Sequence, residues 1–386
     1  MTDKFPLSND ECLEKIQNPT DEGDFRMTPI MTPRNLICVL SLLALFATAS
    51  QARAADQINR KRDRPLSGEV SGMSKTEVTL KVTTPKADTI KVPANEVASI
   101  VWVGESADCN VARKDEEGGK YQKAIDGYQK ALQSSKTPSA NLKNDLDFGI
   151  ARATGKLALA DSSKVDEAIK KLEEFRSKQS DHYRYYDCVN LLGQLYAARK
   201  DFLKAGLAFD TLGKAPWKEY QMAAKIAGGR LALAENKLDE AAAAYEAVVA
   251  MPAEGAVEES QRQEAVLGKA RVMLLQKKFD DALKLLKEVI DKAPADDYRV
   301  NAEAYLRQGD CLREQGNDSD AVLSYLAVDV LFASERELHA EALYRLATLW
   351  EKLGNKLRAE EARDRIRSEY ENSEWARQLK APAAGG

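Results

Sequence analysis

The sequence predicts a mainly α-helical solenoid preceded by a small all-β, barrel-like module. Of the 386 residues, 31% are charged and 44% are hydrophobic, and good helix formers dominate, which favours amphipathic helices. A small–large–apolar triplet recurs every 36 to 44 residues, the period of a repeat array. A separate stretch near the N-terminus is β-branched and alternating, as strands are.

Residues 1–54 predict a leader that directs export. The apolar run Leu36–Ala49 is too short to span a bilayer, which needs about 20 residues. Arg34 precedes the run, and the tripeptide Ala52–Ala54 fits a small-x-small cleavage pattern. We therefore expect a signal peptide that is cleaved after Ala54, a periplasmic or cell-envelope location, and no stable membrane span after cleavage.

Two features near the leader leave alternatives open. Residues 1–26 are acidic, unlike the start of a signal peptide, so Met1, Met27 and Met31 all remain candidate starts. The basic run Arg60–Arg64 follows the cut and disfavours export. It is expected to be a solvated linker, but the distribution of charge also fits an uncleaved anchor with the bulk of the chain in the cytoplasm.

Residues 56–105 predict a small β module. Val78, Leu80 and Val82 alternate with polar residues, and glycines and prolines punctuate four or five short segments. The order of these segments resembles the Sm-like or SH3-like small barrels, a resemblance that implies binding of RNA or peptides, or no known ligand. Trp102 is the module's one aromatic residue, which disfavours base stacking, and a packing cap for the following helices is an equal alternative.

Residues 106–376 predict helix pairs, and residues 377–386 predict a disordered tail. Each second helix carries one triplet on one face: Ala124/Tyr128/Ala131, Ala168/Leu172/Phe175, Ala205/Phe209/Leu212, Ala241/Tyr245/Val248, Ala282/Leu286/Val289, Ala321/Tyr325/Val328 and a weaker Ala359/Arg363/Ile366. Six to seven pairs are expected.

Glycines in the first helices explain how the pairs pack. Gly193, Gly229 and Gly309 lie twelve residues before the leading alanines Ala205, Ala241 and Ala321, respectively. Small residues at both points predict a close helix crossing, which offsets the helix cost of glycine of about 1 kcal/mol. Gly206 is expected to widen the same contact.

These motifs resemble the tetratricopeptide repeat (TPR) family. Leu192, Gly193 and Tyr196 match its first helix, whereas Ala205, Phe209 and the closing Pro216 match its second. The spacings are longer than the family's, and Arg363 replaces an aromatic residue in the last repeat, as expected of an end that faces water. With the leader, the chain resembles exported TPR proteins of the bacterial envelope.

The resemblance implies a concave groove lined by the first helices. In the family, ligands contact first-helix positions near the Leu-Gly pair. The corresponding positions of this chain are the candidate partner-binding residues Asn190, Gln194, Arg230, Arg271, Asp310 and Arg313. Arg230 and Arg271 hold equivalent places in neighbouring repeats and would suit a carboxylate or an acidic peptide. Ordinary pairing with glutamates inside the solenoid is the alternative.

Catalytic motifs are not found in the sequence. Phosphate loops, dinucleotide fingerprints, HExxH and GxSxG are missing, and the two histidines, His182 and His339, are far apart. The segment Asp181–Cys188 groups reactive side chains, but its tyrosines lie where repeat packing needs bulk. Cys109, Cys188 and Cys311 have no metal or disulfide spacing and predict buried thiols. We expect no enzyme activity, no cofactor and no metal.

Two functions from different classes follow. The first is a non-catalytic, exported interaction scaffold that binds a peptide or partner protein in its groove, and the net charge of −4 gives no reason to expect a nucleic acid. The alternative is a cytoplasmic or membrane-tethered regulator whose β module binds RNA and whose repeats recruit protein.

Overall fold

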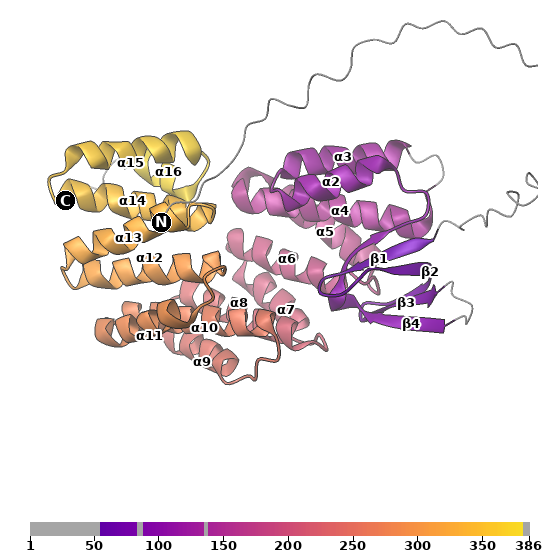
Figure 1. Cartoon of the computed structure of the whole chain (residues 1–386), viewed down its shortest axis with the longest axis horizontal. Helices are drawn as coiled ribbons and strands as arrows, with labels where there is room; N and C mark the ends of the chain where they lie inside the picture. The colour runs from indigo at the N-terminus through magenta and orange to yellow at the C-terminus, as the bar shows by residue number, and fades with distance from the viewer. Residues whose placement is uncertain (1–54, 83–87, 135–137, 381–386) are drawn as a thin grey trace, which may run out of the picture. The chain divides into compact units, whose positions relative to one another are not determined.

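The computed structural model describes residues 55–82, 88–134 and 138–380, in which a small sheet is followed by helices (Figure 1). The predicted leader, its cleavage site and the alternative start residues lie outside these ranges, except that Ala55 is the first residue described. Within the described ranges, no helix has both the length and the apolar character needed to cross a membrane.

The β module is an antiparallel sheet of five strands, ordered β4-β3-β2-β1-β5. Its strands are β1 (Asp56–Arg60), β2 (Leu66–Met73), β3 (Glu77–Val82), β4 (Asp88–Pro93) and β5 (Val97–Val101), with the 3-10 turn η1 (Ala94–Glu96) before β5. The predicted alternation is confirmed in β3, where Val78 and Leu80 are fully buried and Lys81 is exposed. These buried residues share one hydrophobic core with the first helices, so the sheet does cap the solenoid.

The helices form consecutive packed pairs, as the triplets predict. The bounds are α2 (Ala107–Glu117), α3 (Tyr121–Ser134), α4 (Ala140–Ala160), α5 (Val165–Lys178), α6 (Tyr185–Ala198), α7 (Phe202–Leu212), α8 (Lys218–Ala234), α9 (Leu238–Val249), α10 (Ala256–Leu275), α11 (Phe279–Lys292), α12 (Tyr298–Glu314), α13 (Asp318–Leu331), α14 (Arg336–Lys352), α15 (Lys356–Glu369) and α16 (Glu374–Lys380), with a 3-10 turn η2 (Ser162–Lys164) before α5. Helix α16 runs past residue 376, the predicted end of the repeats, and Ala376 is buried against α14 and α15; residues 381–386 of the predicted tail lie outside the described ranges.

Most turns inside a pair pass through one residue in the left-handed backbone region. Glycine provides this conformation at Gly316 (φ 79°) and Gly354 (φ 80°). Lysine adopts it at Lys200 (φ 63°) and Lys277 (φ 60°), where a side chain makes the conformation less favourable. The turn geometry is therefore imposed by the packing of the helix pair rather than by the local sequence.

The three predicted packing glycines contact aromatic rings rather than the leading alanines. A Cβ atom on Gly193, Gly229 or Gly309 would lie 2.5, 2.8 or 2.5 Å, respectively, from the ring of Phe209, Tyr245 or Tyr325. The leading alanines Ala205, Ala241 and Ala321 are fully buried beside these rings. The close crossing is thus confirmed, but the partner of each glycine is the large residue of the triplet.

Two other glycines differ from expectation. A Cβ atom on Gly206 would have no atom within 4 Å, so the prediction that this glycine widens the helix contact is wrong. Gly268 of α10 lies outside the positions that the repeat frame selects, yet a Cβ there would lie 2.5 Å from the Tyr245 ring. The ring of Tyr245 therefore has a glycine of α8 and a glycine of α10 against it, which fixes how two neighbouring repeats stack.

The three cysteines of the described residues, Cys109, Cys188 and Cys311, are buried free thiols, as predicted. Burial raises the pKa of Cys188 and of Cys311 to about 12 in each case, so both stay protonated at neutral pH. They act as small apolar side chains in the core.

Candidate functional site

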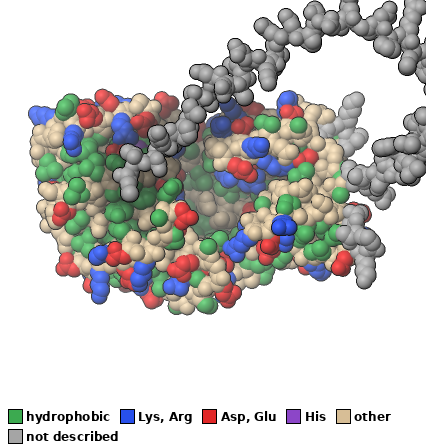
Figure 2. Space-filling model, in the orientation of Figure 1, with side chains coloured by type: hydrophobic (Ala, Val, Ile, Leu, Met, Phe, Trp, Pro, Cys, Tyr) green, Lys and Arg blue, Asp and Glu red, His purple; other side chains and the backbone are tan. Residues whose placement is uncertain are grey.

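A cavity of about 490 Å³ lies where helices α6, α7, α8 and α10 meet, and we refer to it as the groove cavity. It is lined by Leu159, Asn190, Gln194, Ala197, Phe202, Phe209, Ala223, Ile226, Ala227, Arg230, Leu231, Ala234, Gln261, Glu264 and Arg299. Three of the predicted groove residues, Asn190, Gln194 and Arg230, are thus brought together. Figure 2 shows that one face of the protein is hollowed, with hydrophobic side chains on the walls of the hollow.

Polar groups surround an apolar floor in the groove cavity. Gln194 donates a hydrogen bond of 3.3 Å from its amide nitrogen to the side-chain oxygen of Asn190. Arg230, whose side chain is 52% exposed, forms an ion pair with Glu264. This pair is the intra-solenoid alternative that the sequence left open. Because an exposed ion pair contributes only about 0–1 kcal/mol, a ligand carboxylate can replace Glu264 at little cost.

Arg230 and Arg271 act on the same tyrosine hydroxyl. Burial raises the pKa of Tyr245 to about 12, and the positive charges of Arg230 and Arg271 oppose that rise. Arg271 does not line the groove cavity, so Arg230 is the member of this predicted pair that the structure places there.

The remaining two predicted groove residues have local partners. Asp310 is only 5% exposed, accepts a hydrogen bond of 2.9 Å from the Tyr325 hydroxyl and pairs with Arg307 at 2.6 Å. The frame places Asp310 on the groove surface, but the structure places it inside, where it is one of two carboxylates that pair with the buried Arg307. Arg313 is half-buried and pairs with Glu314 at 2.7 Å.

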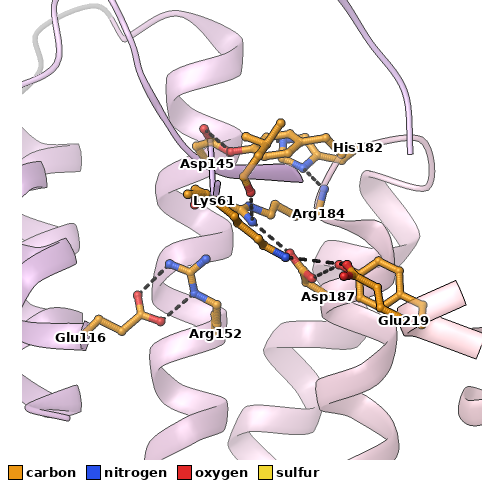
Figure 3. A network of polar contacts seen from close by, with 12 residues as sticks. Lys61, Glu116, Asp145, Arg152, His182, Arg184, Asp187 and Glu219 are labelled. Atoms are coloured by element: carbon orange, nitrogen blue, oxygen red, sulfur yellow. Dashed lines mark hydrogen bonds and ion pairs between the residues drawn. The ribbon is translucent and has the colours of Figure 1, made fainter. Parts of the chain in front are cut away.

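A second polar region joins the β module to the helices, with residues from both sides meeting in Figure 3. Arg184, at the start of α6, donates hydrogen bonds to the backbone oxygens of Val97 (3.2 Å) and Ala98 (2.5 Å). Its guanidinium also pairs with Asp187 at 3.0 Å. Because β5 is an edge strand, these bonds satisfy carbonyl groups that no other strand covers.

Asp145 collects three partners at the same junction. It accepts hydrogen bonds from the indole nitrogen of Trp102 at 2.6 Å and from the Tyr183 hydroxyl at 3.0 Å, and the ring of His182 lies 3.5 Å away. Burial lowers the pKa of His182 to about 4, so the ring is neutral at pH 7. The segment Asp181–Cys188 therefore packs the junction, as its tyrosines predict.

Glu116 anchors the other side of the junction network (Figure 3). Arg152 donates two hydrogen bonds to its carboxylate, at 2.6 and 2.7 Å, and Lys156 donates one at 2.9 Å. Burial alone raises the pKa of Glu116, but the hydrogen bonds and charges of these two cations outweigh it and hold the pKa at about 2. Glu116 is ionised at all physiological pH values and acts as a structural counter-ion.

Among the described residues, no group of three or more histidine, cysteine, aspartate or glutamate side chains is arranged to hold a metal ion. No sequence pattern signals the junction network, because Arg184 and the strand that it contacts are 87 residues apart. The chemistry available at the groove cavity is recognition: amide groups for a peptide backbone, an apolar floor and an exchangeable ion pair.

Comparison with known proteins supports this class of repeat. Residues 226–297 match the family model described as Tetratricopeptide repeat. The structure resembles a tetratricopeptide repeat protein from Parabacteroides merdae ATCC 43184, with a TM-score of 0.51, 16% identity, and 70% of this chain and 95% of that chain covered. The protein thus has the fold of a TPR solenoid with a small antiparallel sheet at its N-terminal end.

Two further solved structures are similar at lower scores. The Rap protein complexed with Competence and Sporulation Factor has a TM-score of 0.47 and 14% identity, with 70% of this chain and 77% of that chain covered. The apo form of RapI has a TM-score of 0.45 and 12% identity, with 71% and 79% covered, respectively. No curated protein sequence matches this chain.

Proposed function

We propose that the protein is a non-catalytic interaction scaffold that binds a peptide or partner protein in the groove cavity. The observation that carries this proposal is the convergence of Asn190, Gln194 and Arg230 around an apolar floor. Amide side chains both donate to and accept from an extended backbone, while the floor receives an apolar side chain of the ligand.

The groove cavity also has a charge that a ligand can use. Arg230 and Glu264 neutralise one another in the free protein, and their half-exposed position keeps the pair weak. A ligand carboxylate that displaces Glu264 gains a bidentate contact with the guanidinium group. We therefore expect the preferred ligand to be a segment with one acidic and one apolar side chain.

We further propose that the protein works in the periplasm or cell envelope after cleavage behind Ala54. This location is supported by the signal pattern of the leader. A membrane-tethered or cytoplasmic regulator is the outcome that the experiment below must exclude.

The test is crosslinked affinity capture from the native cells, read by mass spectrometry. Ala227→Arg places a long side chain in the groove cavity, whereas Ala243→Arg makes the same change at an exposed position of α9. The proposal expects partners that are captured by the wild type and by Ala243→Arg but are reduced at least about tenfold by Ala227→Arg. Equal capture by both variants, with both folded by circular dichroism, would exclude the groove as the binding site.

The same spectra report the N-terminal peptide. A chain that begins at Ala55, with envelope proteins captured, is the expected result. A chain that retains residues 35–50, with cytoplasmic or RNA-associated partners, would replace the exported scaffold with the regulator.

A further inference from the structure

A larger cleft, of about 980 Å³, lies at the junction of the β module and the helices, and we refer to it as the junction cleft. It is bordered by the residues after β1, by η1, by the start of α8 and by the start of α10. The junction cleft adjoins the groove cavity, since Asn190, Ala223 and Gln261 line both.

Three side-chain oxygens that line the junction cleft lack a hydrogen-bond donor. They are Oδ1 of Asn95, Oε2 of Glu258 and Oε1 of Gln261. Across the described part of the chain, no other buried side-chain oxygen is without a partner. Buried acceptors in proteins are nearly always hydrogen-bonded, so three unpaired ones in one cleft point to a donor that binds there.

The orientation of the two amides is fixed by their nitrogen atoms. Asn95 donates from its amide nitrogen to the carboxylate of Glu219 at 3.3 Å, and Gln261 donates to the backbone oxygen of Glu219 at 2.9 Å. Turning either amide over would exchange these bonds for contacts between two acceptors. The oxygens are therefore held as acceptors, and only a donor from another source can pair with them.

The lysine and arginine side chains beside the junction cleft do not donate hydrogen bonds to these three oxygens. Lys61 lies 4.0 Å from Glu219, and Lys218 pairs with Glu254 at 2.5 Å. Arg62 approaches the backbone at Gly255, beside the Glu258 carboxylate, but no ion pair joins Arg62 to Glu258 among the described residues.

Aromatic side chains complete the cleft. Trp217 and Tyr220 line it, with ring centroids 5.5 Å apart, and both are half-buried. The faces of such rings attract a guanidinium or ammonium group, most strongly when solvent is partly excluded. The three unpaired oxygens, one of which belongs to the Glu258 carboxylate, and the two aromatic rings together suit a cation with several N–H donors.

We propose that the junction cleft binds an extended segment of a partner protein through an arginine side chain. A guanidinium group carries five N–H donors in one plane, which suits acceptors on two sides of a cleft. The junction cleft shares part of its lining with the groove cavity but has the opposite charge preference, so peptides of opposite charge distinguish failure of one proposal from failure of the other. Together the two sites would hold a partner segment that carries charges of both signs.

The test uses the purified full chain and three labelled pentapeptides in fluorescence anisotropy titrations. The acetylated peptides Gly-Ser-Xaa-Ser-Gly carry arginine, its neutral analogue citrulline, or glutamate at the central position. We expect the arginine peptide to bind at least about tenfold more tightly than the citrulline peptide, because charge-assisted hydrogen bonds are about twice as strong as neutral ones. The glutamate peptide should not bind at the junction cleft.

Matched variants place the binding. Glu258→Gln keeps the shape of the side chain but removes its charge, and it should weaken binding of the arginine peptide by about tenfold. Glu240→Gln makes the same change on the exposed start of α9 and should leave the affinity unchanged. Equal binding of the arginine and citrulline peptides, equal loss in both variants, or no saturable binding up to about 1 mM would overturn the proposal.

Discussion

Two adjacent glycines of α8 provide a stringent test of how the repeats pack. Gly228 and Gly229 lie in the interior of the same helix, but their surroundings differ. A Cβ atom on Gly228 would have nothing within 4 Å, whereas one on Gly229 would lie 2.8 Å from two ring atoms of Tyr245. The same substitution, glycine to alanine, should therefore have opposite effects at the two positions.

The magnitudes follow from two terms. Alanine in a helix interior is favoured over glycine by about 1 kcal/mol, so Gly228→Ala should raise the free energy of unfolding by about that amount. At Gly229 the same gain is opposed by overpacking, which costs about 1–3 kcal/mol. The Tyr245 ring cannot retreat towards α10, because Gly268 already lies against it, so the cost lies towards the upper end of that range. We therefore expect Gly229→Ala to lower the free energy of unfolding by up to about 2 kcal/mol.

Urea unfolding followed by far-UV circular dichroism measures both variants against the wild type. Repeat proteins unfold in a nearly additive, repeat-by-repeat manner, so hydrogen exchange of α8, α9 and α10 should accompany the global measurement. The reasoning is refuted if the two variants shift stability in the same direction by the same amount, because the Tyr245 contact would then contribute nothing.

Four other outcomes are expected. Gly309→Leu should overpack its helix crossing and lower the free energy of unfolding in urea by about 1–3 kcal/mol or more. The exposed substitution Lys356→Ala should leave that free energy nearly unchanged, and equal effects of the two would show that the repeat assignment is wrong. Lys277→Gly relieves a left-handed lysine and should raise the melting temperature, with a gain of about 1 kcal/mol; a decrease would mean that the turn is not strained. Burial lowers the pKa of His182 to about 4, so the unfolded chain takes up a proton first as the pH falls. The contribution of His182 to the free energy of unfolding is complete above about pH 6.5 and is lost towards pH 4, by up to about 3 kcal/mol. His182→Gln should remove this pH dependence of the free energy, as measured by urea unfolding at several pH values. An unchanged pH dependence would contradict a buried neutral ring. Arg184→Met should cost about 3–5 kcal/mol and raise hydrogen exchange in β5 above that in β3; uniform exchange across the sheet would argue against its role at the edge strand.

Local periodicity carries the prediction of the fold. Hydrophobic residues spaced by four and three must lie on one helix face, so a triplet such as Ala241/Tyr245/Val248 defines a buried stripe without knowledge of its partner. In the same way the alternation of Val78 and Leu80 requires a strand with one buried face. The sequence also locates Gly193, Gly229 and Gly309 as packing positions.

Periodicity specifies which face is buried but not what covers it, and this limits the prediction. The repeat frame pairs Gly229 with Ala241, yet Gly229 contacts Tyr245, because the position of the ring depends on its side-chain rotamer and on the neighbouring helix. Gly206 follows a packing alanine in sequence but points away from the partner helix. Asp310 occupies a groove position in the repeat frame but turns inward, where it joins Glu341 as a counter-ion of the buried Arg307.

Local patterns in the sequence therefore specify the helical repeat, the strands of the β module, three packing glycines and three of the residues that line the groove cavity. Tertiary packing alone brings Arg184 to the β5 edge and places the unpaired oxygens of Asn95, Glu258 and Gln261 in one cleft. The physical reason is that the direction of side chains repeats every two residues in a strand and every 3.6 in a helix, so a short stretch of sequence shows which face is buried. Contacts between residues 87 or 124 positions apart, such as Arg184 with Val97 and Asn95 with Glu219, exist only once the whole chain has packed.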